Sequence, residues 1–494
     1  MSIPADNHYA RLGVHRDASP EEVRSAYHEA AKRLHPDVNP DPAAMDVFLA
    51  IQESYEVLSS PDRRQDYDSS LPETGAAPPL VKVGVTFSRS SLARIGEPQL
   101  IYAMIELGAK PTEELAGRPP MNLCLVLDRS TSMQGLRLDT LKSTARELIR
   151  QLHYQDYLSI VVFSDNAEVI LPASRGIDLP KVEARISMVQ SSGGTEIFKG
   201  LNAGFFEIQR YAGPAYINHL ILITDGRTYG DEEDSLSLAV KARDKGITIS
   251  GLGIGTEWND SFMDELTGLT GGNSQFIASA EDLQAFLADK FSGLGKIFAE
   301  RLSINFIQDP NVELKYLFRL DPDPGPLPLL RPLVVGNLPR DSTMTLLMEF
   351  LVSSVPEDAG LVNLVRGDLK LDIPLQMIPT TKIPLALTMP TSENIDPEPP
   401  PDKIVRALSR LTLYRMQEQA RAEIAAGNFE QATRRLQNLA THLLSQGEKG
   451  LARTVLAEAD RLEKEHSFSE QGEKRIKYGT RALLLPTFLE DNPG

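Results

Sequence analysis

The first 70 residues carry apolar side chains at the spacing of amphipathic helices. Apolar positions recur three and four residues apart over 23–34 and again over 48–58, which predicts two helices that each bury one stripe. The sequence Ser-Pro-Glu-Glu at 19–22 is typical of a helix start in which serine and glutamate cap each other. The expected buried positions are Val23, Ala26, Tyr27, Ala30 and Leu34 in the first helix and Phe48, Ile51, Tyr55 and Leu58 in the second.

From Asn122 onwards the pattern changes to apolar runs that alternate with helical periods. This alternation is typical of a doubly wound parallel sheet covered by helices on both faces. The run at 167–171 is shorter and more polar, so we expect it to form an edge strand. The central strands are expected at 123–127, 158–163, 220–224 and 247–254.

Strand-like alternation also flanks this region on both sides. It occurs at 81–87 and 99–107 before it, and at 302–307, 312–318, 343–352 and 361–373 after it. Because an inserted domain is tolerated where its two ends lie close together, we expect one β-sandwich that is built from both flanks. Helical periods then return over 402–464, and the apolar run at 482–485 favours a final strand.

These patterns divide the chain into several domains. The sandwich is expected from 81–118 and 301–390, the inserted α/β domain from 119–300, and proline-rich linkers at 71–80 and 391–402. The remaining parts are an all-α domain at 1–70, a helical domain at 403–466 and a tail at 467–494.

Composition narrows the possible functions. The chain has 494 residues, 41% of them hydrophobic, one cysteine and a net charge of −17. One cysteine excludes an internal disulfide framework, and the negative charge disfavours nucleic acid and anionic membranes as partners. The N-terminus lacks the basic start and apolar core of a secretory signal, and no apolar run is long enough to span a membrane. We therefore expect a cytoplasmic protein.

The helical N-terminal segment contains the tripeptide His35-Pro36-Asp37 just after its first long helix. Arg24, His28 and Lys32 lie four residues apart, so they form one basic face of that helix. With the flanking sequences Tyr-Ala-Arg-Leu-Gly-Val at 9–14 and Pro-Asp-Arg-Arg-Gln-Asp-Tyr-Asp at 61–68, this segment resembles the J-domain of DnaJ-type co-chaperones over about residues 6–68. The resemblance implies that the tripeptide and the basic face contact a DnaK-type chaperone and stimulate its ATP hydrolysis.

The segment departs from the family in two places. Leu34 stands where the family usually has tyrosine, and Glu29 interrupts the basic face. The glycine/phenylalanine-rich linker and the cysteine-rich zinc module of full-length DnaJ are absent from the sequence, so the J-domain is joined to a different body.

Polar loops follow the expected strands at the edge where such sheets bind ligands. Two carboxylates and three hydroxyls without histidine or cysteine suit a hard cation such as Mg²⁺ or Mn²⁺, although each motif alone also fits helix capping or a turn. The constellation resembles the metal-ion-dependent adhesion site of von Willebrand factor A (vWA) domains, over about residues 119–300. The resemblance assigns the metal to Asp128, Ser130, Ser132, Thr195 and Asp225, with a partner's carboxylate completing the coordination.

Two questions stay open at the level of sequence. Arg129 and Arg227 adjoin these positions and could either weaken cation binding or attract an acidic partner. The helices after 402 resemble tetratricopeptide hairpins but lack the repeats of a solenoid, so a helical lid on the sandwich is the favoured interpretation.

The sequence contains no P-loop, zinc-protease motif, nucleophile elbow or dinucleotide fingerprint, so we expect a binding protein with no catalytic residues. The leading hypothesis is a co-chaperone adaptor that recruits a DnaK-type chaperone and holds a partner protein through the metal. The alternative is a metal-dependent scaffold or assembly factor, such as a partner of a ring-forming ATPase, in which the J-domain only docks.

Overall fold

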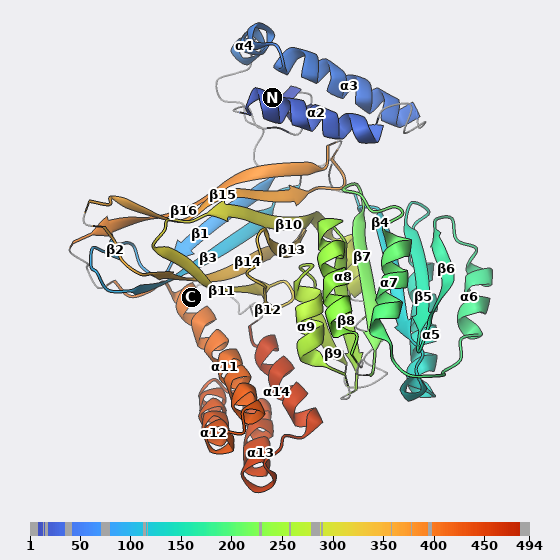
Figure 1. Ribbon diagram of the computed structural model, residues 1–494, viewed down its shortest axis with the longest axis vertical. Coiled ribbons are helices and arrows are strands. Elements are labelled where there is room, and N and C mark those ends of the chain that lie inside the picture. Colours follow the sequence, from blue (N-terminus) through green and yellow to red (C-terminus); the bar gives the residue numbers. More distant parts are fainter. Residues whose placement is uncertain are drawn as a thin grey trace, which may run out of the picture.

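A computed structural model of the chain shows four structural parts (Figure 1). The described residues are 8–12, 14, 18–34, 42–70, 80–111, 115, 117–226, 230–255, 258–277, 287, 290–356, 358–376, 378–393 and 398–484. The multidomain fold class predicted from the sequence is confirmed, because an all-α domain, an α/β domain, a β-sandwich and a helical C-terminal part are all present.

The N-terminal domain consists of four helices around a small core. Ser19 Oγ accepts a hydrogen bond from the Glu22 backbone N–H at 3.2 Å, and Glu22 Oε2 accepts one from the Ser19 N–H at 2.8 Å, so the predicted capping box is present. Tyr27 and Tyr55 stack with ring centroids 4.3 Å apart and join the two long helices. The helices are α1 (His8–Leu12), α2 (Pro20–Leu34), α3 (Pro42–Leu58) and α4 (Pro61–Ser70).

The α/β domain has a six-stranded sheet in the order β6-β5-β4-β7-β8-β9. All neighbours are parallel except β6, which pairs with β5 in the antiparallel direction and is the predicted edge strand. Only β9 was not expected, and it has just four residues. The strands are β4 (Met121–Asp128), β5 (Tyr157–Phe163), β6 (Ala167–Ser174), β7 (Ile217–Thr224), β8 (Thr248–Ile254) and β9 (Ser274–Ile277).

Helices cover both faces of this sheet, as the alternating pattern predicts. Apolar side chains of α5 and α6 share one core with the sheet, and those of α7, α8 and α9 share the other. The connections also include the short 3₁₀ helix η2 (Thr131–Met133), and the α-helices are α5 (Leu136–Arg150), α6 (Leu179–Ser187), α7 (Ile197–Ile208), α8 (Glu232–Asp244) and α9 (Asp260–Gly268).

The β-sandwich draws strands from both sides of the α/β domain. Its two sheets have the orders β1-β3-β14-β11-β12 and β13-β10-β15-β16-β2, so β3 and β2 pair with strands that come about 235 to 300 residues later. The strands are β1 (Val81–Phe87), β2 (Leu92–Ala93), β3 (Gln99–Ala109), β10 (Ile297–Ile307), β11 (Val312–Asp321), β12 (Gly325–Pro326), β13 (Leu333–Pro339), β14 (Thr343–Val352), β15 (Leu361–Asp372) and β16 (Thr380–Ser392).

The sequence analysis did not anticipate β2, β12, β13 or β16. The longest of these, β16, contains Pro384 and Pro390, which ordinarily argue against a strand. Its neighbour on one side is β15, which pairs with residues 380–390, but on the other side only two residues of β2 pair with it. Among the described residues, most of that edge has no strand partner, and such an edge tolerates proline.

Arg340 contacts both of the connections that join the sandwich to the α/β domain. The Arg340 backbone N–H donates to the Lys296 carbonyl at 2.8 Å, and its guanidinium donates to the Gly117 carbonyl at 2.5 Å. Arg319, which is buried, donates to the carbonyls of Gly271 at 2.7 Å and Val335 at 2.9 Å, so it bridges the same two domains. The inserted domain is therefore fixed against the sandwich by hydrogen bonds as well as by its two connections.

The C-terminal part consists of α11 (Asp402–Ala425), α12 (Phe429–Ser445), α13 (Lys449–Glu465) and α14 (Glu470–Ala482). It packs on the sandwich, as the lid interpretation predicted, because α11 buries Ile404, Leu411 and Tyr414 against strands of the first sheet. The expected tail from 467 instead contains α14, and the expected strand at 482–485 is wrong for its described residues, which end this helix. Among the described helices, none is long and apolar enough to cross a membrane.

Buried charges, together with the ring of Tyr478 beside Trp258 and Phe276, attach α14 to the α/β domain. Arg481 donates to both carboxylate oxygens of Asp264 at 3.0 and 2.6 Å. Lys477, which is almost completely buried, contacts Asp264 at 2.7 Å and Asp260 at 2.6 Å. Burial alone would raise the pKa of Asp264, but Arg481 and Lys477 together hold this pKa well below its usual value.

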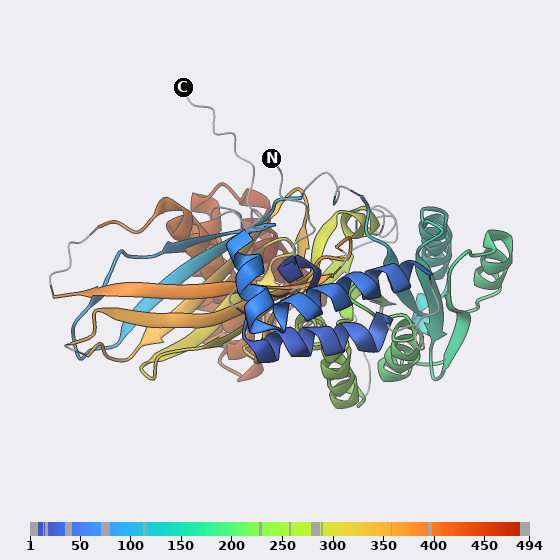
Figure 2. The same ribbon diagram turned by 90° about the horizontal axis from the view of Figure 1, so that it is seen from above.

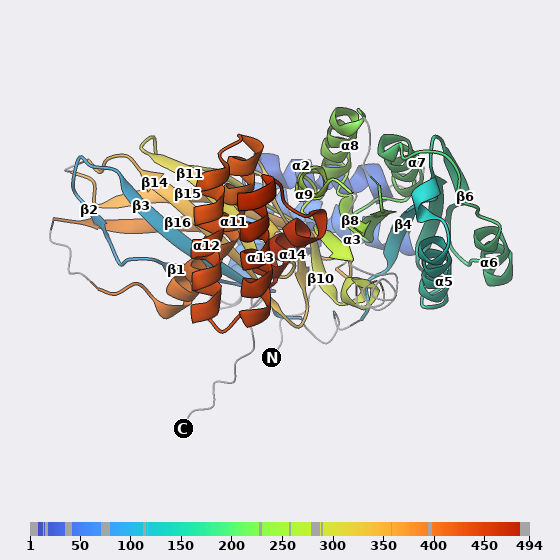
Figure 3. The same cartoon turned by 90° about the horizontal axis from the view of Figure 1, so that it is seen from below.

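The J-like helices and the C-terminal helices lie on opposite sides of the molecule. Seen from above, α2 and α3 lie in front of the sandwich and the α/β domain (Figure 2). Seen from below, α11–α14 lie in front, together with the short cyan helix η2 (Figure 3). The N-terminal domain contacts the sandwich through Ile378, which packs against its core.

We predict that Asp264→Asn weakens the attachment of α14. The change leaves Lys477 and Arg481 without their shared carboxylate, which costs about 3 kcal/mol for a buried pair. Because its folded-state pKa is depressed, Asp264 contributes stability that is fully present above the unfolded-state pKa of about 3.9 and is lost as the pH falls through lower values. The measurement is the thermal midpoint of both proteins at pH 7 and at about pH 2, and the difference between the two proteins should be larger at pH 7.

The control is Glu430→Gln, which removes one partner of an exposed ion pair with Arg434 and should change stability by no more than about 0.5 kcal/mol. Equal midpoints for the two variants at pH 7 would show that the buried network does not hold α14.

Candidate functional site

Three loops meet at the carboxyl edge of the parallel sheet. Asp128 is the last residue of β4, and Asp225 follows the last residue of β7, the strand next to it. Both backbones run in the same direction, so the two side chains leave the sheet side by side. Thr195 lies in the third loop, two residues before α7.

Hydrogen bonds connect four of the five predicted ligands. The Ser130 backbone N–H donates to Asp128 Oδ1 at 2.7 Å, and the hydroxyls of Ser130 and Ser132 lie 2.9 Å apart. Ser132 Oγ donates to Asp225 Oδ1 at 2.7 Å. The sequence Asp-x-Ser-x-Ser thus folds into a turn whose oxygens extend from one carboxylate to the other.

Thr195 reaches the same place from the glycine loop. Its hydroxyl lies so close to Gly226 that a Cβ added there would be only 2.8 Å from Thr195 Oγ1. Asp165 holds this loop, because its Oδ1 accepts a hydrogen bond from the Gly194 N–H at 2.8 Å. All five residues predicted as metal ligands therefore converge at one edge.

The two carboxylates are fully buried. The pKa of Asp128 is raised to about 6, because burial, with the nearby charge of Asp225, outweighs the hydrogen bonds from Thr224 and Ser130 that lower it. Thr224 Oγ1 donates to Asp128 Oδ2 at 2.6 Å. Two negative charges that are buried at the ends of neighbouring strands are unfavourable unless cations or hydrogen-bond donors compensate them.

The arginines around the site differ in orientation. Arg129 turns away from Asp128 and lies 3.6 Å from Glu168 of β6. Arg137, which the sequence analysis did not single out, forms an ion pair with Asp225 instead. Arg227 lies outside the described residues. Arg129, which the sequence analysis had considered as a neighbour of the metal site, thus pairs with Glu168 and not with Asp128 or Asp225.

The donor set fits a small hard cation. Within the described ranges, no group of three or more His, Cys, Asp or Glu side chains could hold a metal ion. A cation here would therefore depend on two carboxylates, three hydroxyls and water, which is the chemistry that Mg²⁺ accepts. The sequence missed Thr224, Asp165 and Arg137, of which only Thr224 had a local signal, because it adjoins Asp225.

The second candidate site lies on the N-terminal domain. Arg24, His28 and Lys32 are all exposed on α2, as the spacing predicts. His35, Pro36 and Asp37 lie outside the described residues. The basic face is therefore available to a partner, whereas the position of the tripeptide remains a prediction.

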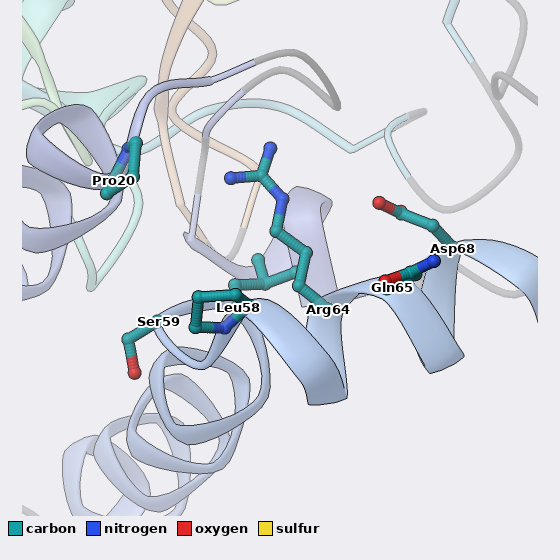
Figure 4. A pocket seen from close by; sticks show the side chains of 7 residues that line it. Pro20, Leu58, Ser59, Arg64, Gln65 and Asp68 are labelled. Carbon is teal, nitrogen blue, oxygen red and sulfur yellow. The ribbon is translucent and has the colours of Figure 1, made fainter.

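A hollow of about 510 Å³ lies at the other end of this domain (Figure 4). It is formed by Pro20 at the start of α2, by Leu58 at the end of α3, and by α4 residues such as Arg64. The hollow lies at the start of α2, whereas the tripeptide follows the end of that helix in the sequence.

Comparison with known families identifies the two domains in which these candidate sites lie. Residues 7–68 match the DnaJ domain family, and residues 122–297 match the von Willebrand factor type A domain family. The chain is a J-domain–vWA fusion protein. Residues 402–486 of the fusion protein match a third family, described as the Sll0103-like C-terminal alpha-helical domain, and this range includes α14.

Two curated relatives cover different parts of the fusion protein. The uncharacterized protein sll0103 of Synechocystis sp. is 27% identical over 379 residues, which are 75% of this chain and 89% of that protein. Chaperone protein DnaJ 2 of Streptomyces avermitilis is 52% identical over 64 residues, or 13% of this chain and 17% of the chaperone. The similarity to the chaperone is thus confined to the J-domain.

Solved structures share the fold of the body. A von Willebrand factor type A protein from Catenulispora acidiphila has a TM-score of 0.65 at 14% identity, covering 83% of this chain and 98% of that one. The ArnB paralog VWA2 from Sulfolobus acidocaldarius has a TM-score of 0.54 at 15% identity, covering 82% and 99%. At these identities the similarity establishes the fold alone.

We predict that Gly193→Ala distorts the loop that carries Thr195. Gly193 has φ +76°, and a Cβ there would lie 2.2 Å from Asp165 Oδ2, the residue that holds the loop. The left-handed backbone costs an L-residue about 1–2 kcal/mol, and displacing Asp165 adds about 1–3 kcal/mol. The measurement is the thermal midpoint of the vWA transition.

Gly176→Ala is the matched control, because Gly176 has φ +64° and no atom within 4 Å of an added Cβ. Gly176→Ala should lose only the stability that the left-handed backbone costs an L-residue. If both variants lose the same stability, Asp165 does not constrain the glycine loop.

Proposed function

We propose that the fusion protein is a co-chaperone adaptor of the cytoplasm, with no catalytic chemistry of its own. Its J-domain recruits a DnaK-type chaperone and stimulates ATP hydrolysis by it. Its vWA domain binds a partner protein through a divalent cation, Mg²⁺ or Mn²⁺. The observation that carries the proposal is the convergence of Asp128, Ser130, Ser132, Thr195 and Asp225 at one edge of the sheet.

Charge supports a cation at this edge. Two buried carboxylates leave two negative charges that a divalent ion neutralises in full. Asp128, Ser130, Ser132, Thr195 and Asp225 would hold the ion directly or through water. When bound, the ion supplies an open coordination position for an oxygen ligand, which a carboxylate of the partner protein would fill.

Charge also supports the chaperone contact. The exposed cations of α2 belong to a chain whose net charge is −17, so this local basic face contrasts with the rest of the protein. A positive face gives an acidic partner surface a faster approach and a fixed orientation more than raw affinity. The match of residues 7–68 to the DnaJ family supports a DnaK-type chaperone as that partner.

We expect His35→Gln to abolish stimulation of the chaperone's ATPase. The tripeptide is the part that the J-domain resemblance assigns to coupling, and the change removes the imidazole without altering the helices. The measurement is single-turnover ATP hydrolysis by a DnaK-type chaperone with the wild-type and variant full chains. His442→Gln, an exposed histidine on α12, is the control and should stimulate like the wild type. Full stimulation by His35→Gln would refute the J-domain half of the proposal.

We expect the partner protein to bind only with metal. In a pull-down from lysate, the wild-type chain should retain its partner in Mg²⁺ and lose it in chelator, and Asp128→Ala should lose it in both. Asp244→Ala, an exposed carboxylate at the end of α8, should behave like the wild type.

The same pull-down tests the alternative function. Retention of every partner by Asp128→Ala would contradict the metal-dependent half and place recognition on the sandwich or the helices. A metal-dependent partner whose function in the cell is unaffected by His35→Gln would favour the scaffold or assembly factor over the co-chaperone.

A further inference from the structure

Arg137 forms an ion pair with Asp225, one of the two buried carboxylates of the candidate metal site. It extends from the first turn of α5, donates to Asp225 Oδ2, and approaches the Ser132 carbonyl at 3.4 Å. Its side chain is 39% exposed, whereas that of Asp225 is fully buried. The guanidinium therefore covers a buried carboxylate from the solvent side.

The surrounding backbone leaves room for this guanidinium. Gly255, at the end of β8, has φ +75°, and a Cβ there would lie 3.0 Å from Arg137 Nη2. A larger residue at 255 would therefore crowd the arginine. The contact is thus made by three separate segments, namely the start of α5, the loop after β7 and the loop after β8.

The ion pair with Arg137 changes the net charge of the two-carboxylate site. Asp128 and Asp225 together carry −2, and Arg137 reduces the sum to −1. If a divalent ion bound while Arg137 stayed at Asp225, the net charge of the site would be +1. If the ion bound without Arg137, the net charge would be 0. A cation and the guanidinium at the same carboxylate repel each other, and the low-dielectric surroundings make this repulsion costly.

We propose that Arg137 is a built-in counter-ion of Asp225. The guanidinium of Arg137 must leave the Asp225 carboxylate before that carboxylate can bind a divalent cation. This inference rests on the proposed function and adds a regulatory element to it. The exposed guanidinium has solvent beside it into which it can move. Once it has moved, it remains at the rim of the site, where it adds a positive charge for the carboxylate of the partner protein.

The test is the affinity of the full chain for Mn²⁺, measured from the electron paramagnetic resonance signal of the free ion. Arg137→Met keeps most of the apolar stem but removes the charge. Because a partly exposed ion pair contributes up to about 1 kcal/mol, the variant should bind Mn²⁺ up to about fivefold more tightly than the wild type. Arg129→Met is the matched control, since it removes a positive charge adjoining Asp128 that points to Glu168; its affinity should stay within about twofold of the wild type.

A second readout is thermal stability. In chelator, Arg137→Met should unfold at a lower temperature than the wild type, because Asp225 loses its only guanidinium contact among the described residues. Saturating Mn²⁺ should remove this difference. A structural role without competition would leave the deficit the same in both conditions.

The outcomes separate this inference from the proposed function. Equal Mn²⁺ affinity in the wild type and Arg137→Met overturns the counter-ion role alone. An equal gain in Arg129→Met also overturns it, because general charge at the rim would then be the cause. If neither the wild type nor either variant binds Mn²⁺, the metal-dependent function itself fails.

Discussion

The burial of two carboxylates at one edge of a parallel sheet is the constraint on which the vWA site depends. β4 and β7 are neighbours in the same direction, so Asp128 and Asp225 leave the sheet next to each other and out of water. Each must then find donors or cations. Thr224 and the Ser130 N–H compensate Asp128, while Ser132 and Arg137 compensate Asp225. The local geometry of the loops thus follows from the need to solvate these two charges with protein groups.

The same constraint explains which parts of the site could be predicted from sequence. Apolar strands followed by Asp are a local signal for Asp128 and Asp225, and the glycine loop before a helix is one for Thr195; the structure brings these three residues to the same edge. The contact between Arg137 and Asp225 joins residues 88 positions apart. It depends on how α5 lies against the sheet and on the space at Gly255, and neither is encoded in a local pattern. The convergence of the five side chains was therefore predictable, but the ion pair between Arg137 and Asp225 was not.

A similar distinction applies to the fold. The helices of the J-domain and the central strands follow from periods of apolar residues, and they form where the periods indicate. β16 was hidden by its prolines, which are tolerated because most of one edge has no strand partner. α14 was hidden because the residues it buries against α9 are Lys477 and Arg481. A helix that buries charges in ion pairs has no apolar stripe toward that partner, so periodicity does not reveal it.

The position of α14 connects the C-terminal helices to the rim of the vWA site. Lys474 donates to the Trp258 carbonyl at 2.5 Å, and Lys477 contacts Asp260, so α14 contacts the segment between β8 and α9. Gly255, at the start of that same segment, lies beside Arg137. The contacts of α14 with Trp258 and Asp260 therefore lie at the α9 end of the segment that begins at Gly255, beside Arg137. Since α2 and α3 lie on the opposite side of the molecule (Figures 2 and 3), the C-terminal helices, and not the J-domain, border the surface on which a partner protein would be held.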